Sequence, residues 1–138
     1  MSVGFVVKYY WYQVGSSDFL YSFFSTVAYN LEEKKWGSKY PYIMLELYAG
    51  CLKKNHIKFA ISELDALTKR LKDFDCSHVV WNFENLSLLP PWGNNISPDI
   101  TDLSNYFVTS DGEDFLTIFR HALEKGLETD CDVLIKSL

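Results

Sequence analysis

The stretch VGFVVKYYWYQVGSSDFLYSFFSTVAYNLEE, residues 3–33, places an expected strand directly before an expected helix. Residues 3–14 are dense in β-branched and aromatic side chains, which predicts one long strand. Ser16 or Ser17 can cap the helix that follows, and Asp18 lies in its first turn, where the helix dipole favours an acid. Because large apolar side chains recur all along this helix, we expect it to be central to the core.

Outside this stretch, the pattern predicts three further helices and several short strands. The clearest helix covers residues 55–74, with Leu64 in the middle of its apolar face. Residues 84–105 have no regular pattern and contain PPWGNN; so long a loop inside a compact domain is uncommon and often functional. The remaining expected elements are a short helix over 41–48, strands over 78–83, 106–109 and 132–136, and a helix after the capping box Ser110-x-x-Glu113.

This order of elements predicts an α+β fold. We expect a small, mainly antiparallel or mixed sheet of three to four strands packed with about four helices. The chain has 138 residues, of which 48% are hydrophobic and 22% charged, so we expect a single folded domain over residues 1–138. Aromatic residues make up 17%, more than so small an interior can hold, and some are expected on a surface that meets a partner.

Charge is distributed unevenly along the chain. Residues 1–72 carry ten Lys/Arg and six Asp/Glu, and residues 73–138 carry three and twelve, so the halves have net charges of +4 and −9, which add to −5. This asymmetry predicts an acidic face, suited to a basic partner and unfavourable for nucleic acid. The alternative, that folding mixes both halves over the surface, stays open at this point.

We expect a cytoplasmic protein that neither crosses a membrane nor carries a signal peptide. Met1 leads straight into an apolar segment without a basic region or a cleavage site, and no stretch approaches the ~18 apolar residues of a membrane span. Three widely spaced cysteines without a C-x-x-C predict neither a disulfide framework nor a zinc site. No metal and no cofactor is expected.

Common catalytic signatures are missing from the sequence. The glycines never form a phosphate-binding or dinucleotide-binding loop, and neither G-x-S-x-G nor H-E-x-x-H occurs. The enzyme hypothesis that stays open is a small hydrolase using His78 or His121 with acidic residues of the 99–114 region. A scaffold or adaptor domain is a further alternative.

The candidate partner-binding residues lie within a segment of thirty-one residues, 84–114, that contains no Lys or Arg. Trp92 either pins its loop or presents its ring to a partner, and the last three acids can equally serve the start of a helix. The candidate residues are Glu84, Trp92, Asp99, Asp102, Asp111, Glu113 and Asp114.

Three segments carry a family resemblance: YWYQVGSSDFLYSFFSTVAYNLE at 10–32, WGSKYPYIMLELY at 36–48, and PPWGNNISPDITDLSNYFVTSDG at 90–112. Together they resemble the immunity protein 70 family. The resemblance implies a non-enzymatic cytoplasmic protein, encoded beside a polymorphic or contact-dependent bacterial toxin, that binds the C-terminal domain of this cognate toxin. It brings no catalytic residues. An acidic face would suit a nuclease-type toxin whose basic active site or substrate path it covers.

Overall fold

The N-terminal stretch forms a β-hairpin. In the computed structural model, which describes residues 2–93 and 95–137, β1 (Ser2–Val7) pairs antiparallel with β2 (Tyr10–Ser16). The prediction of a single strand over residues 3–14 is therefore wrong. Lys8 adopts a left-handed conformation (φ 57°), and the chain reverses over Lys8 and Tyr9 without the glycine or asparagine that usually marks such a turn.

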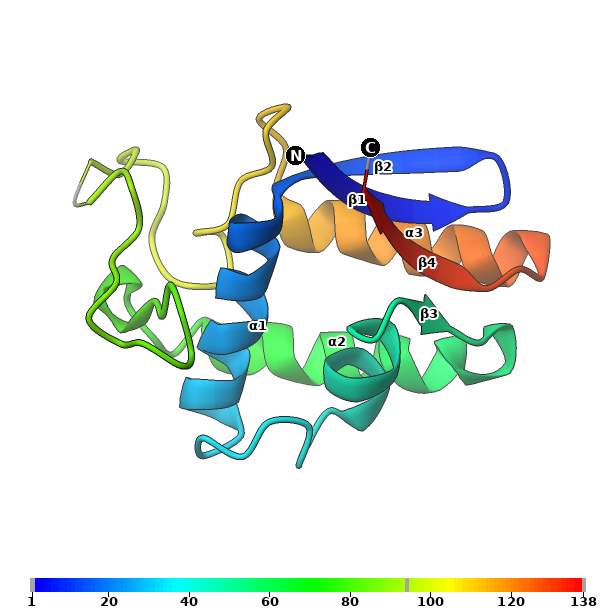
Figure 1. The fold of residues 1–138 in the computed structure, drawn as a ribbon, viewed down its shortest axis with the longest axis horizontal. Coiled ribbons are helices and arrows are strands. Elements are labelled where there is room, and N and C mark those ends of the chain that lie inside the picture. The colour runs from blue at the N-terminus through cyan, green and yellow to red at the C-terminus, as the bar shows by residue number, and fades with distance from the viewer. Residues whose placement is uncertain (1, 94, 138) are drawn as a thin grey trace.

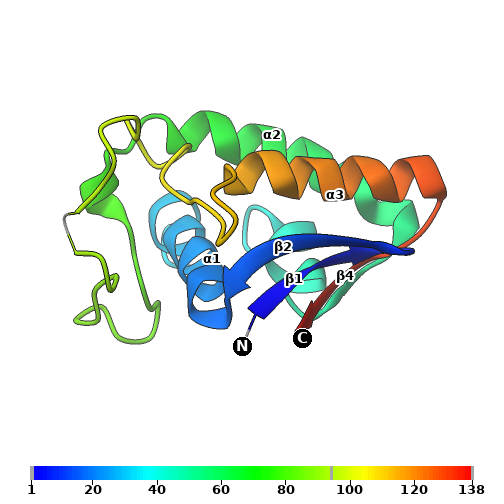
Figure 2. The same ribbon diagram turned by 90° about the horizontal axis from the view of Figure 1, so that it is seen from above.

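Four antiparallel strands form the sheet, in the order β2-β1-β4-β3. The C-terminal strand was expected and is β4 (Val133–Ser137), whereas the two-residue β3 (Cys51–Leu52) was not expected. Pairing of β1 with β4 brings the two ends of the chain side by side (Figures 1 and 2). The predicted α+β class and strand number are confirmed.

Three α-helices cover one side of the sheet. The first, α1 (Ser17–Leu31), is capped by Ser16, whose hydroxyl accepts a hydrogen bond from the Phe19 N–H, as predicted. The other two, α2 (Ile57–Leu71) and α3 (Phe115–Thr129), lie antiparallel beside each other, with α1 across one end (Figures 1 and 2). Shorter helical turns are the π-helix η1 (Tyr42–Leu47) and the 3-10 turns η2 (Lys54–His56) and η3 (Cys76–His78).

The core lies between the sheet and these helices. Phe5 of β1 contacts Phe119 of α3 at 5.0 Å between ring centroids, and Phe23 of α1 contacts Phe115 at 4.7 Å. Leu64 is 1% exposed, which agrees with the apolar face predicted for α2. The sheet and the three helices thus share one hydrophobic core.

Two predicted strands are not formed. Residues 78–83 run irregularly along α1, because the Val80 carbonyl accepts hydrogen bonds from Ser22 and Thr26 and its N–H donates to Thr26. Hydrogen bonds from side chains of α1 thus take the place of backbone pairing with a neighbouring strand. Residues 106–109 form only an isolated bridge between Val108 and Asp114.

The start of α3 also differs from its prediction. Asp114, not Ser110, caps the helix: its carboxylate accepts from the Thr117 N–H at 3.1 Å and the Thr117 hydroxyl at 2.8 Å. The preceding turn is closed by Thr109, whose hydroxyl accepts from the Glu113 N–H. The expected capping box is therefore wrong, since Glu113 precedes the helix and its backbone belongs to that turn.

Within the described residues, no helix is long and apolar enough to cross a bilayer. Cys51, Cys76 and Cys131 are free. No group of three or more His, Cys, Asp or Glu side chains in this part of the chain is arranged to hold a metal ion.

Candidate partner-binding surface

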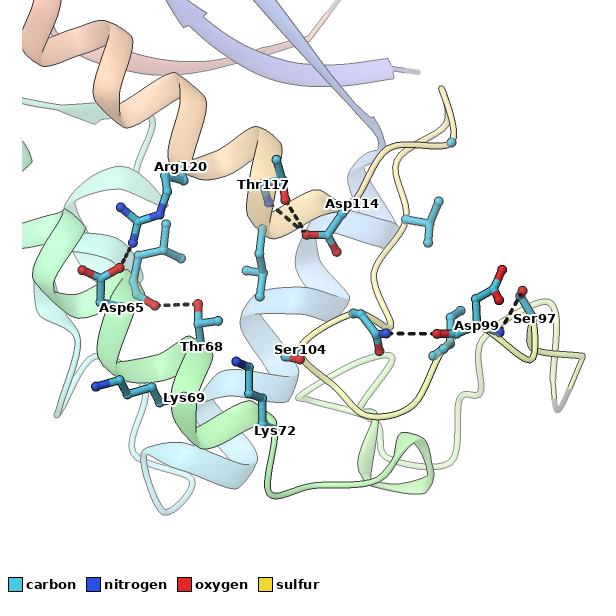
Figure 3. A pocket seen from close by; sticks show the side chains of 16 residues that line it. Asp65, Thr68, Lys69, Lys72, Ser97, Asp99, Ser104, Asp114, Thr117 and Arg120 are labelled. Atoms are coloured by element: carbon cyan, nitrogen blue, oxygen red, sulfur yellow. Dashed lines mark hydrogen bonds and ion pairs between the residues drawn. The ribbon is translucent and has the colours of Figure 1, made fainter.

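An open groove of about 930 Å³ lies between α2, the start of α3 and the irregular segment before α3 (Figure 3). Leu64, Ile100, Val108 and Leu116 give it an apolar component. Its polar lining comes from all three sides: Asp65, Thr68, Lys69 and Lys72 from α2 and the residue after it, Asp114, Thr117 and Arg120 from the start of α3, and Ser97, Asp99, Ser104 and Asn105 from the irregular segment.

The walls of the groove carry different charges. Lys69 belongs to α2 and Lys72 directly follows it, and the Lys72 side chain extends into the groove near Ser104 (Figure 3). Arg120 forms an ion pair with Asp65, so its charge is already offset within the chain. On the wall made by the irregular segment, no described cation contacts the Asp99 carboxylate, whereas Asp102 lies close enough to Lys72 for the lysine charge to act on it.

A second, smaller pocket of about 170 Å³ adjoins the groove and shares Ser97, Ile100 and Val108 with it. Trp92 forms one side: its indole N–H donates to the Tyr106 hydroxyl at 2.7 Å, and its ring meets Trp81 edge to face at 5.4 Å. Burial raises the pKa of Tyr106, against the opposing effect of this hydrogen bond. Trp92 thus pins its loop, as one of the two hypotheses held, while 37% of the residue stays exposed.

The structure brings most of the predicted site residues together. Asp99 and Asp114 line the groove, Trp92 lines the adjoining pocket, and Asp102 lies beside the lining residue Ser104. Asp111 and Glu113 are exposed on the turn that leads into α3 and flank the lining residue Gly112.

Glu84 is the exception. It lies against Tyr21 of α1. Burial of Tyr21 raises the pKa of this tyrosine most, and the nearby charge of Glu84 raises it further. Tyr21 stacks on Trp36, whereas Phe19 lines the smaller pocket. Residues two apart on a helix point ~200° apart, so Glu84 lies on the other side of α1 from the groove.

Two of these acids have structural roles. Asp102 accepts hydrogen bonds from the Ser104 N–H at 2.8 Å and the Thr101 hydroxyl at 3.0 Å. Partial burial acts to raise the pKa of Asp102, but the hydrogen bonds outweigh it and hold this pKa below its usual range. Asp114 caps α3. These carboxylates are therefore tied to the local fold.

Three other acids are free to meet a partner. Within residues 2–93 and 95–137, no hydrogen bond or ion pair reaches the carboxylates of Asp99, Asp111 and Glu113. All three residues are exposed. They supply negative charge that no described cation of the chain neutralises by direct contact.

The histidines of the hydrolase hypothesis lie elsewhere. His78 is exposed, and its Nδ1 is 3.2 Å from a carboxylate oxygen of Asp75. His121 is one helical turn before Lys125, which lies over the Tyr10 ring of β2. Of the described residues that line the groove, none is a histidine. Among the described residues, no hydrogen bond or ion pair joins either histidine to an acid of residues 99–114.

Sequence reasoning missed three exposed leucines in the irregular segment before Trp92. Leu86, Leu88 and Leu89 are 53%, 46% and 74% exposed in the irregular segment that leads to Trp92. Exposed apolar side chains grouped in this way mark interaction surfaces. The available signal was a set of leucines without helical or strand periodicity in a stretch without cations.

An acidic surface with exposed apolar side chains has the features of a protein-binding domain. The family model of immunity protein 70 matches residues 5–135, nearly the whole chain. The chain belongs to the immunity protein 70 family, and the predicted resemblance is confirmed. Membership implies neutralisation of a cognate toxin. No curated protein and no solved structure matches the chain.

Proposed function

We propose that this chain is a non-enzymatic, cytoplasmic immunity protein that binds the C-terminal domain of its cognate toxin and covers the active site or substrate path. Family membership supports the coarse function. The surface formed by residues 86–114 and the α2–α3 groove, here called the acidic surface, is the proposed contact. Glu84 is the predicted residue that this surface leaves out, because it lies across α1.

The observation that carries this assignment is the charge of the segment that forms the surface. Residues 86–114 contain five Asp/Glu and no Lys or Arg. A protein that cleaves nucleic acid holds phosphates with Lys and Arg, so its cleft attracts a surface of this kind. Like-charge repulsion would disfavour nucleic acid itself. We therefore propose a nuclease-type toxin as the partner.

Exposed apolar side chains would complement this charge. Charge complementarity mainly accelerates association, whereas buried aromatic and apolar anchors slow dissociation. Trp92 and the exposed leucines at 86, 88 and 89 belong to the same cation-free segment as the free carboxylates of Asp99, Asp111 and Glu113. An inhibitor that must act before the toxin does damage needs both properties.

The test is titration of the purified toxin domain, taken from the gene beside the one encoding this chain, with the wild-type protein. We expect inhibition to be complete at one equivalent, and the toxin to regain full activity after denaturing separation and refolding. Inactivation by much less than one equivalent, or recovery of a covalently altered toxin, would instead show an enzyme. No inhibition at any ratio would reject the proposal.

A further inference from the structure

The pocket beside Trp92 has the size and lining of a site for one apolar side chain. Six of its eight lining residues are apolar or aromatic, and an apolar cavity of ~150 Å³ is large enough to bind benzene. At about 170 Å³ it has room for one leucine, methionine or phenylalanine side chain. The lining residues are Phe19, Trp92, Asn95, Ile96, Ser97, Ile100, Tyr106 and Val108.

Its walls are held in place by contacts within the chain. Trp92 is fixed by its hydrogen bond to Tyr106 and by Trp81, and Tyr106 packs edge to face on Phe107 at 5.1 Å. Phe19 meets the same Phe107 at 5.8 Å. A ligand side chain would therefore enter a formed pocket, without the cost of ordering its walls.

Negative charge borders this pocket on the side of the groove. Asp99 lies between the shared lining residues Ser97 and Ile100, and no hydrogen bond or ion pair from the described residues reaches its carboxylate. The lysines of the groove, Lys69 and Lys72, lie on and directly after α2, and neither contacts the Asp99 carboxylate. A cationic side chain next to the apolar one would thus meet an unneutralised carboxylate.

We propose that one apolar side chain of the toxin, followed within a few residues by Lys or Arg, inserts into the pocket while its cationic neighbour meets Asp99. This inference rests on the proposed function and names the contact that would determine which toxin is recognised. A second copy of this chain could offer the exposed Leu89 to the pocket, but the segment around Leu89 contains no cation to meet Asp99. Charge complementarity therefore favours a basic toxin as the occupant.

The experiment fills the pocket. Val108 lines it but is 42% exposed, so Val108→Trp can occupy the space without disrupting the core. Leu127→Trp is the matched control: this residue is 40% exposed and lies near the opposite end of α3. Loss of a buried hot-spot contact corresponds to at least ~30-fold in affinity. We expect Val108→Trp to weaken toxin binding by this factor, through faster dissociation, and Leu127→Trp to bind like wild type.

A second measurement needs no toxin. Benzene added to the labelled protein should shift the methyl resonances of Ile96, Ile100 and Val108 in wild type, and should not bind Val108→Trp. If circular dichroism shows that Val108→Trp is unfolded, Ile96→Trp replaces it with the same expected results.

The outcomes separate the two proposals. Equal toxin binding by wild type and a folded pocket-filled variant, or the absence of benzene shifts in wild type, overturns the pocket while the proposed function stands. A wild-type dimer that the filled variant abolishes makes a second copy the occupant and also overturns it. If wild type itself does not bind the toxin, the proposed function fails and the pocket assignment fails with it.

Discussion

Neutralising the three free carboxylates, with Asp99→Asn, Asp111→Asn and Glu113→Gln combined, should slow association with the toxin while the fold stays intact. No hydrogen bond from the described residues reaches these carboxylates, so their loss removes charge and no internal contact. Asp102 and Asp114 are left unchanged, because one is held by Ser104 and the other caps α3. The net charge of the chain changes from −5 to −2.

The size of the effect follows from Coulomb's law. A pair of opposite unit charges ~10 Å apart in water gains about 0.4 kcal/mol. Three carboxylates that each face one toxin cation at this distance contribute about 1.2 kcal/mol, which is roughly an eightfold change in association rate at low salt. At about 1 M salt the Debye length falls to ~3 Å, so the difference should disappear.

Stopped-flow association at several salt concentrations measures this directly. The matched control, Glu124→Gln, Glu128→Gln and Asp130→Asn combined, changes the net charge equally. Glu124 lies ~14 Å along α3 from its start, Glu128 and Asp130 lie ~20 Å or more from it, and the ion pairs of all three are exposed. We expect the control to associate nearly as fast as wild type. Equal slowing by both variants, or no slowing by either, would refute local steering by the acidic surface.

Further predictions concern the fold that supports this surface. Leu64→Ala should lower the free energy of unfolding by about 2–5 kcal/mol, because the side chain is fully buried; an unchanged thermal midpoint would contradict this. Glu32→Ala should lower the free energy of unfolding in urea by about 3 kcal/mol, because the buried carboxylate accepts hydrogen bonds from three backbone N–H groups of residues 37–40. The control Glu33→Ala, at an exposed residue, should lower it by less than about 0.5 kcal/mol, and equal losses would refute this role of Glu32. Burial raises the pKa of Glu63 above its ordinary 4.5, so protonation of this carboxyl stabilises the folded state. This contribution is fully present below pH 4.5 and is lost as the pH rises through the folded-state pKa. Relative to Glu63→Gln, wild type should therefore lose stability in urea unfolding between acidic and neutral pH, and a relative gain would show the opposite shift.

The fold class could be predicted because it depends on local patterns. The apolar spacing around Leu64 and the Ser16 cap each determine a helix within a few residues of its ends. The hairpin could not be predicted, since Lys8 and Tyr9 give no turn signal and the left-handed conformation of Lys8 is imposed by the paired strands. Val79 and Val80 look like a strand, but their segment is held by hydroxyl groups of α1 that lie far away in sequence.

The site was predictable to a similar extent. Charge along the chain identified the acids, and six of the seven candidate residues do lie together beside the groove and its adjoining pocket. Sequence could not show that Asp102 and Asp114 are used by the local fold, because both roles depend on hydrogen bonds formed only after the turns close. Nor could it place Glu84 across α1 or bring Phe19 to Trp92, since these contacts are tertiary.

Hydrogen–deuterium exchange of the one-to-one complex with the toxin domain tests the central claim most directly. If the acidic surface binds the toxin, complex formation should slow exchange in residues 86–114 and in the parts of α2 and α3 that line the groove. Exchange in residues 3–12 of the aromatic hairpin and in residues 34–39, a basic turn, should stay unchanged; Gln13 and Val14 are left out because they hydrogen-bond to Ser110 of the surface. Protection confined to those two segments, with residues 86–114 unaffected, would contradict the account and move the interface to the hairpin and the basic turn.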